Sequence, residues 1–174
     1  MEVSEALAII EKIIEAHRKL IVNDYAALEK MANDASVMRG LESGIEAFMP
    51  GRHLAKDGPG EIELLLTSVA RGLQAHFNFE ETSLPGVITQ YGDEDMMATL
   101  RIILQEHGDL RGRIALSEKH VSDLAGGKLS RQVWDATAHD MRAHIAHTRR
   151  LLLTHASTEQ KLLQSIKNRL KAGV

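Results

Sequence analysis

The chain has 174 residues, of which 44% are hydrophobic, and this length is enough for one domain with a continuous core. Its formal net charge is -3, and its 21 basic and 24 acidic residues are interspersed, so no basic patch for nucleic acid is expected. No apolar run approaches the roughly 18 residues of a membrane helix, and the amino terminus does not have the pattern of a signal peptide. We therefore expect a cytoplasmic protein without a membrane partner. Cysteine is absent, so any metal must be bound by nitrogen and oxygen ligands.

The composition indicates helices, because prolines number only three and aromatic residues make up only 3%. The first predicted helix is amphipathic and runs from about Ser4 to Ala32. The following stretch, 33–60, is rich in glycine and holds two of the prolines, so it is predicted to be a long connection with one short helix near 37–48.

The second predicted helix begins near Glu61, and Pro85 should kink it or end it near Ser83. Asp93 is the predicted N-cap of a third helix, which two glycines at 126 and 127 should end.

Ser130 is the predicted N-cap of a fourth helix that continues to about Ala156. A separate short helix, 158–171, is expected to follow, with Ser157 as its N-cap. Four long helices with short links between the last three predict an all-α, antiparallel up-down four-helix bundle. The expected organisation is a single domain, 1–174, with its core at about 4–156 and an extra C-terminal helix at 157–174.

Four of the nine histidines, His17, His76, His107 and His144, lie on the apolar faces of the four long predicted helices. Counted from the predicted helix starts, all four lie at a similar depth, roughly 20 Å along each axis, so they should meet at mid-height. Glu80 lies one turn after His76 on the same face. The sequence therefore predicts four imidazoles and a carboxylate in the bundle core.

A single histidine on an apolar face is more often a core residue with a satisfied hydrogen bond than a metal ligand. Four imidazoles and a carboxylate buried together without partners would cost several kcal/mol in all. A bound cation is the simplest arrangement that satisfies them, so we predict a metal site.

The segments His76-Phe-Asn-Phe-Glu80-Glu81-Thr-Ser-Leu84-Pro85, Glu106-His107 and Arg142-Ala-His144-Ile145 resemble those of the haemerythrin-like (HHE cation-binding) family. In that family a His-x-x-x-Glu motif followed by a leucine-proline turn recurs in the second helix, with single histidines in the others. The resemblance covers about Ile9 to His155. It implies a four-helix bundle around a non-haem di-iron site that binds oxygen, senses iron, or handles nitric oxide or oxidative stress.

One departure from the family pattern concerns the fourth helix, where the family usually repeats His-x-x-x-Glu. Four residues after His144 stands Thr148, so a second bridging carboxylate is missing there, and one metal ion or an incomplete pair is expected. His147 and Asp24 are further candidate ligands. Arg111, four residues after His107, should turn its guanidinium away from a metal.

The remaining polar residues of interest are predicted to have other roles. Asp140 could orient His144 by accepting a hydrogen bond. His155 lies roughly 16 Å beyond His144, so it is predicted to be structural. The histidines at 53, 120 and 139 are predicted to face solvent.

The leading hypothesis is a metal-binding protein of haemerythrin type, holding one or two iron ions, or another transition metal such as zinc, with a diatomic gas as candidate ligand. The alternative is an interaction or sensor module that has kept the fold and lost the complete di-iron site. No motif for hydrolysis, phosphate binding or glycoside chemistry is present, so binding is favoured over turnover. The sequence does not identify a protein partner.

Overall fold

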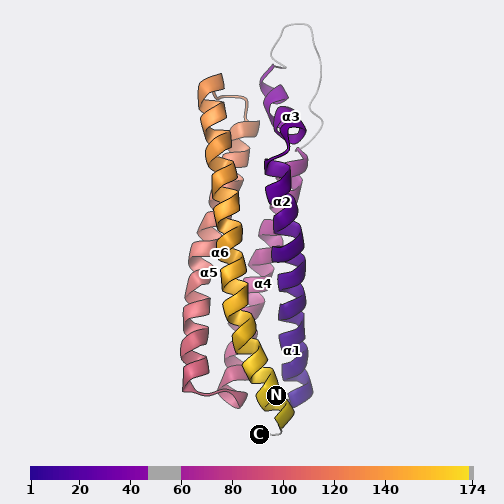
Figure 1. Ribbon diagram of the computed structural model, residues 1–174, viewed down its shortest axis with the longest axis vertical. Coiled ribbons are helices and arrows are strands. Elements are labelled where there is room, and N and C mark those ends of the chain that lie inside the picture. Colours follow the sequence, from indigo (N-terminus) through magenta and orange to yellow (C-terminus); the bar gives the residue numbers. More distant parts are fainter. Residues whose placement is uncertain (47–59, 173–174) are drawn as a thin grey trace.

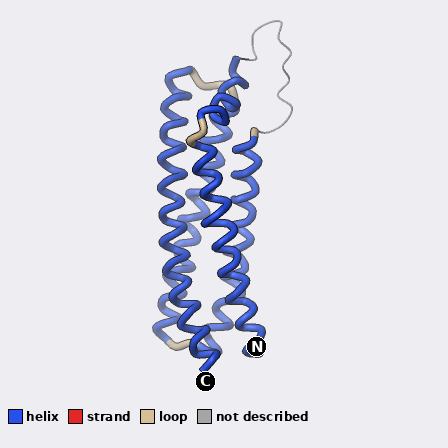
Figure 2. Tube along the Cα trace, turned by 45° about the vertical axis from the view of Figure 1, so that its right-hand side comes forward, coloured by secondary structure: helices blue, strands red, loops and turns tan. Residues whose placement is uncertain are grey.

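The computed structural model describes residues 1–46 and 60–172, and within these residues every regular element is helical and no strand occurs (Figures 1 and 2). The long helices lie side by side as a bundle, and the two chain ends lie at the same end of it. Among the described residues, no helix carries an apolar stretch long enough to cross a bilayer. His53 lies outside the described residues.

The first helical run agrees with the predicted span but has an interruption that was not predicted. It consists of α1 (Val3–Ala16), the π-helical segment η1 (His17–Asp24) and α2 (Tyr25–Ala32). The backbone N–H of His17, the first residue of η1, still donates to the Ile13 and Ile14 carbonyls. π-Helical segments are frequent at functional sites.

The predicted long connection contains the helix α3 (Ala35–Glu46). Asp34 caps its first turn, because the Asp34 carboxylate accepts from the backbone N–H groups of Ser36 and Val37 at 2.7 and 3.4 Å. The rest of the connection up to residue 59 lies outside the described residues.

Helix α4 (Glu61–Tyr91) passes through Pro85, so of the two predicted outcomes, a kink or an end near Ser83, the end is wrong. The missing N–H of a proline costs the helix one hydrogen bond. Leu84, Val87 and Ile88 are buried on either side of that position. Their burial stabilises the last turns of α4 and offsets the lost bond.

Helix α5 (Glu94–Ala125) begins at the predicted N-cap, since the Asp93 carboxylate accepts from the Met96 backbone N–H at 2.9 Å. It ends at Gly126, and Gly127 has a φ of 66°, a left-handed conformation that glycine adopts without strain. Ser130 then caps the next helix, with its hydroxyl 3.4 Å from the Val133 backbone nitrogen.

Helix α6 (Arg131–Ala172) is continuous over 42 residues, so the predicted break at Ser157 and the separate short helix after it are wrong. The segment contains neither glycine nor proline. The Thr158 hydroxyl donates to the Thr154 carbonyl at 3.1 Å, a bond within the helix rather than a cap.

The core consists of two apolar clusters that lie one above the other along the bundle. The upper cluster includes Leu20, Leu73, Leu110 and Leu152, and the lower cluster includes Ile13, Leu84, Ile103 and Leu162. On each long helix these two sets are separated by about two to three turns. Those turns carry the buried polar side chains that form the candidate site.

Candidate metal centre

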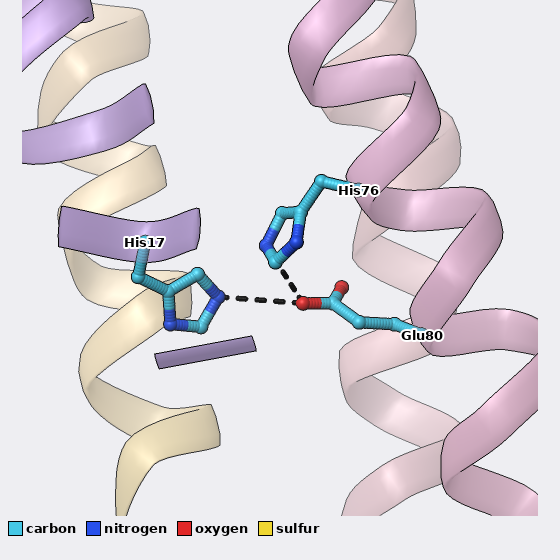
Figure 3. Close-up of side chains that lie close together, drawn as sticks. All are labelled: His17, His76 and Glu80. Carbon is cyan, nitrogen blue, oxygen red and sulfur yellow. Dashed lines mark ion pairs between the residues drawn. The ribbon is translucent and has the colours of Figure 1, made fainter. Parts of the chain in front are cut away.

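Six buried side chains meet in the layer between the two apolar clusters. No residue of the set is more than 7% exposed, and the members are His17 of η1, His76 and Glu80 of α4, His107 of α5, and His155 and Glu159 of α6. Below they are called the central cluster. Figure 3 shows His17, His76 and Glu80, whose polar atoms point toward one another across the gap between two helices.

Glu80 lies at the middle of the central cluster and divides its two oxygens between different histidines. Its Oε1 atom lies 2.7 Å from His76 Nε2 and 3.4 Å from His17 Nε2. Its Oε2 atom lies 3.2 Å from His107 Nε2. A carboxylate placed in this way can serve two neighbouring cations, one with each oxygen.

Glu159 is the second carboxylate of the central cluster and lies between His17 and His155. Its Oε2 atom lies 3.1 Å from His17 Nε2 and 3.8 Å from His155 Nε2. Because Glu159 follows His155 by four residues on one continuous helix, the two side chains share a face. The pair repeats the spacing of His76 and Glu80 on α4.

The polar atoms that face the centre of the cluster are close together but are not aligned as hydrogen bonds. Within the described part of the chain, no hydrogen bond is made by the Nε2 atoms of the four histidines or by either oxygen of Glu80 and Glu159. Burying such atoms without partners is costly. Ligand atoms around one transition-metal ion at about 2.1 Å lie roughly 3 to 3.5 Å from one another, which is close to the spacings seen here.

Two overlapping groups of ligand atoms are compact enough to hold a metal ion. One group is His17, His76 and Glu80, and the other is Glu80, His107 and His155, with the atoms of each group within 4.8 Å of one another. Imidazole nitrogen and carboxylate oxygen are ligands that iron, zinc and other transition metals accept. These buried groups could therefore hold metal ions.

The imidazole rings are fixed by packing as well as by polar contacts. The rings of His17 and His76 meet edge to face, with centroids 4.8 Å apart, and those of His107 and His155 are 5.1 Å apart. Phe77 stacks on His107 with centroids 4.3 Å apart. The apolar neighbours exclude water, which strengthens electrostatic interactions in the layer.

The charges of the central cluster perturb the pKa values of its members. Burial opposes the charged form of His17, but the adjacent carboxylates of Glu159 and Glu80 raise its pKa to about 9. Burial also opposes ionisation of Glu80, yet its three neighbouring imidazoles hold its pKa well below the usual range. Burial lowers the pKa of His155. Without a metal, protons on imidazoles balance the buried carboxylate charge.

The outward-facing nitrogens of two histidines contact further carboxylates. His107 Nδ1 lies 2.9 Å from Glu81 Oε1, and His155 Nδ1 lies 2.8 Å from Glu106 Oε2. Glu81 in turn accepts from Arg111 at 2.8 Å, and this hydrogen bond lowers the pKa of Glu81 despite partial burial. The Arg111 guanidinium thus lies outside the central cluster, in the direction expected from the sequence.

Four of the predicted ligands, His17, His76, Glu80 and His107, are brought together by the structure, but His144 is not. Its Nε2 atom donates to the Arg113 carbonyl at 2.9 Å, and its ring faces His120 with centroids 5.6 Å apart. His120 is half-buried, so the expectation that it faces solvent holds only in part, whereas His139 is exposed as expected.

The other two candidate ligands also lie elsewhere. His147 is exposed, and Asp24 pairs with Lys19 at 2.7 Å. Asp140, the proposed partner of His144, is exposed, and His144 bonds instead to the Arg113 carbonyl.

The residues that the sequence analysis did not place in the cluster are His155 and Glu159, together with the outer carboxylates Glu81 and Glu106. The expectation from Thr148 that the cluster lacks a second carboxylate is wrong, because Glu159 lies in the cluster. Thr148 is buried beside His144, with its hydroxyl 3.5 Å from His144 Nε2. The spacing of His155 and Glu159, identical to that of His76 and Glu80, was the signal that could have identified them.

Comparisons of the chain with models of protein families, with curated proteins and with solved structures find no match.

Proposed function

We propose that the chain is a metal-binding protein of haemerythrin type, with two adjacent metal positions in an antiparallel, up-down four-helix bundle. The observation that carries this proposal is the set of unpaired ligand atoms. Four imidazole Nε2 atoms and four carboxylate oxygens, all buried, converge from four helical segments without hydrogen bonds among the described residues. Cations would satisfy all of these atoms together.

The ligands divide between the two positions in a simple way. His17 and His76 bind one ion, His107 and His155 bind the other, and Glu80 contributes one oxygen to each. Glu159 lies beside both positions and is the second shared carboxylate. The two shared carboxylates offset the mutual repulsion of two cations a few Å apart.

Iron is the metal we propose, and this choice rests on the resemblance of the sequence motifs to the haemerythrin-like family. The donor set is also suited to zinc, copper and nickel. Oxygen and nitric oxide are the ligands that the same resemblance implies, and the proposed activity is binding rather than turnover.

The alternative hypothesis, an interaction module with a degenerate site, depended on Thr148 standing in place of a carboxylate. Glu159 lies in the cluster and provides a second carboxylate. No observation within the described residues now favours that alternative.

The test compares two histidines on the same helix. The natural protein, purified and analysed for metal, should carry about two ions per chain. His155→Ala should lose most of the metal at one position, whereas His144→Ala should keep the full content, because His144 bonds to a carbonyl outside the cluster. Both variants should remain helical by circular dichroism. Loss of metal from His144→Ala with retention in His155→Ala would overturn the ligand assignment, and a metal-free natural protein that takes up none would overturn the function.

A further inference from the structure

Two of the four histidines in the central cluster have a carboxylate on their outward-facing nitrogen. Glu81 accepts from His107 Nδ1 and Glu106 accepts from His155 Nδ1, because an ionised carboxylate can only accept hydrogen bonds. In its neutral form each ring therefore keeps its proton on Nδ1, and its Nε2 atom, which faces Glu80 or Glu159, is left free to bind a metal. The carboxylates hold both imidazoles in the tautomer that can bind a metal.

Among the side chains that the structure describes, the other half of the cluster has no such support. Within residues 1–42 and 60–172, the carboxylates within ion-pair distance of His17 and His76 are Glu80 and Glu159, and both approach Nε2 rather than Nδ1. The outer carboxylates thus belong to one of the two metal positions only.

Glu81 is held rigidly by its surroundings. Arg111 donates to Glu81 at 2.8 Å, and the same guanidinium donates to Gln74 at 3.1 Å and to Asn78 at 3.0 Å. The Arg111 guanidinium also lies over the Phe77 ring, 5.4 Å from its centroid. Since Phe77 stacks on His107, one network fixes both the plane and the outer nitrogen of that imidazole.

Glu106 is less constrained than Glu81. Its side chain is 47% exposed, and it lines a cavity of about 280 Å³ between α5 and α6, together with Asp109, Arg113 and His155. Water can reach this carboxylate and can replace part of its hydrogen bond to His155.

We propose that Glu81 and Glu106 are positioning residues for the metal position formed by Glu80, His107 and His155, and that they do not act on the position formed by His17 and His76. This inference rests on the proposed metal binding. A carboxylate at Nδ1 makes Nε2 a stronger donor and adds negative charge near the ion. The outer carboxylates therefore change metal affinity at one position and not at the other, and Glu81 contributes more than Glu106 because it is anchored.

The test uses Co²⁺ alone as the probe, followed by its visible absorption, on full-length chains. His17→Ala leaves only the supported position, and His107→Ala leaves only the other. In the His17→Ala background, Glu81→Gln should weaken Co²⁺ binding by about 10- to 100-fold and shift the absorption band, with a smaller effect for Glu106→Gln. In the His107→Ala background, neither substitution should change the affinity.

Glutamine keeps the shape of the side chain and can still accept from Nδ1, so the substitution removes charge rather than packing. Asp109→Asn is the matched control for Glu106→Gln, because Asp109 lines the same cavity as Glu106 and, within the described residues, forms no ion pair with an imidazole. Equal effects of Glu81→Gln in both backgrounds, or an effect of Asp109→Asn as large as that of Glu106→Gln, would overturn the inference while leaving metal binding intact.

If either background fails to fold, a two-step Co²⁺ titration of the natural chain and of Glu81→Gln decides the same point. In Glu81→Gln one binding step should weaken and the other should not. Failure of the natural protein to bind Co²⁺ would overturn the proposed function and this inference together.

Discussion

Which histidine of α6 enters the central cluster depends on the level at which it faces α5. The Trp134 indole donates to the Leu124 carbonyl, His144 faces Arg113, and His155 faces Glu106. His144 is therefore level with Arg113, six residues and roughly 9 Å along α5 from His107. The sequence analysis placed His144 at the level of His107 because both lie 14 residues from the predicted starts of their helices. In antiparallel helices, equal distances from the two starts give equal height only if both residues lie at the middle of their helices, and α6 is longer than expected.

A substitution at Thr148 tests whether the His144 level of α6 lies outside the central cluster. Thr148 is fully buried beside His144, and the nearby phenol of Tyr25 has a pKa raised to about 12, chiefly by burial. Thr148→Glu would put a longer, ionisable side chain into this packed region, so it should destabilise the fold by about 3 kcal/mol or more without increasing bound metal.

The measurement for Thr148→Glu is denaturant unfolding together with metal analysis. Thr148→Val, which keeps the volume of the side chain and removes the hydroxyl, is the control and should cost only about 1 kcal/mol. A rise in the metal-to-protein ratio of Thr148→Glu would mean that position 148 faces the metal after all.

Sequence reasoning found three of the four clustered imidazoles, and Glu80, because each lies on an apolar helix face where a polar residue is conspicuous. It excluded His155 because His144 was taken as the ligand of the fourth helix and His155 lies roughly 16 Å further along that helix. It missed Glu159 because the fourth helix was expected to end at Ala156. It missed Glu81 and Glu106 because spacing shows which residues share a helix face, not which side chains meet across two helices. That information depends on helix register.

At the scale of the elements, the continuity of α6 decides the composition of the site. His155 and Glu159 stack on one face only if the helix passes through residues 156–158. Serine and threonine there resemble an N-cap in sequence, but within a packed helix their hydroxyls bond to carbonyls one turn back, as Thr158 does. The π-helical segment at His17 was equally beyond prediction, since a local widening does not change the pattern of apolar residues.

Ser157→Ala separates a continuous helix from two helices joined at Ser157. Ser157 is exposed in the middle of α6, where alanine is the better helix former by about 0.5 kcal/mol, so the substitution should leave stability unchanged or raise it slightly. At an N-cap the same substitution would cost about 1 kcal/mol.

Asp93→Ala is the matched comparison, because Asp93 does cap α5 and also pairs with Arg169. Its loss should lower the free energy of unfolding by about 1 kcal/mol. Equal losses for Ser157→Ala and Asp93→Ala, measured by denaturant unfolding, would argue for a helix boundary at Ser157.

At the scale of the whole molecule, the bundle is two apolar clusters separated by one charged layer. Glu80 and Glu159 are fully buried, so folding removes two carboxylates from water in the middle of the core. Such a layer is stable only when cations or protons balance the carboxylates. Occupancy of the layer is therefore coupled to the stability of the whole chain.

Metal that binds only the folded chain should raise its melting temperature. At free metal 100-fold above the dissociation constant, the expected gain is about 2.7 kcal/mol. For a chain of this length that gain corresponds to a rise of roughly 5 to 10 °C. Thermal unfolding with Fe²⁺ under anaerobic conditions, or with Zn²⁺, measures the effect, and chelator should reverse it.

Mg²⁺ is the control for the thermal experiment, because it prefers oxygen ligands and should not stabilise an imidazole-rich site. His155→Ala should show a smaller rise than the natural protein. A melting temperature that is indifferent to transition metal and chelator would contradict an occupied central cluster.

Without metal, the same layer should make stability depend on pH. The folded pKa of His17 is raised to about 9, so the stabilisation from its charged form is fully present below its unfolded pKa, about 6.5, and is lost as pH rises toward 9. Histidines whose pKa is lowered, such as His155, are neutral in both states above pH 6.5 and add no further change there. The metal-free protein should therefore lose stability, of the order of 3 kcal/mol, between pH 6.5 and 9. Denaturant unfolding of chelator-treated protein across this range measures the loss. Burial opposes the charged form of His107, but Glu80 and Glu81 raise its pKa as well, so His17→Gln should reduce the loss without abolishing it. Metal requires neutral imidazoles, so the metal-loaded protein should show no such decline, and a metal-free protein that gains stability over this range would refute the charge balance argued for the layer.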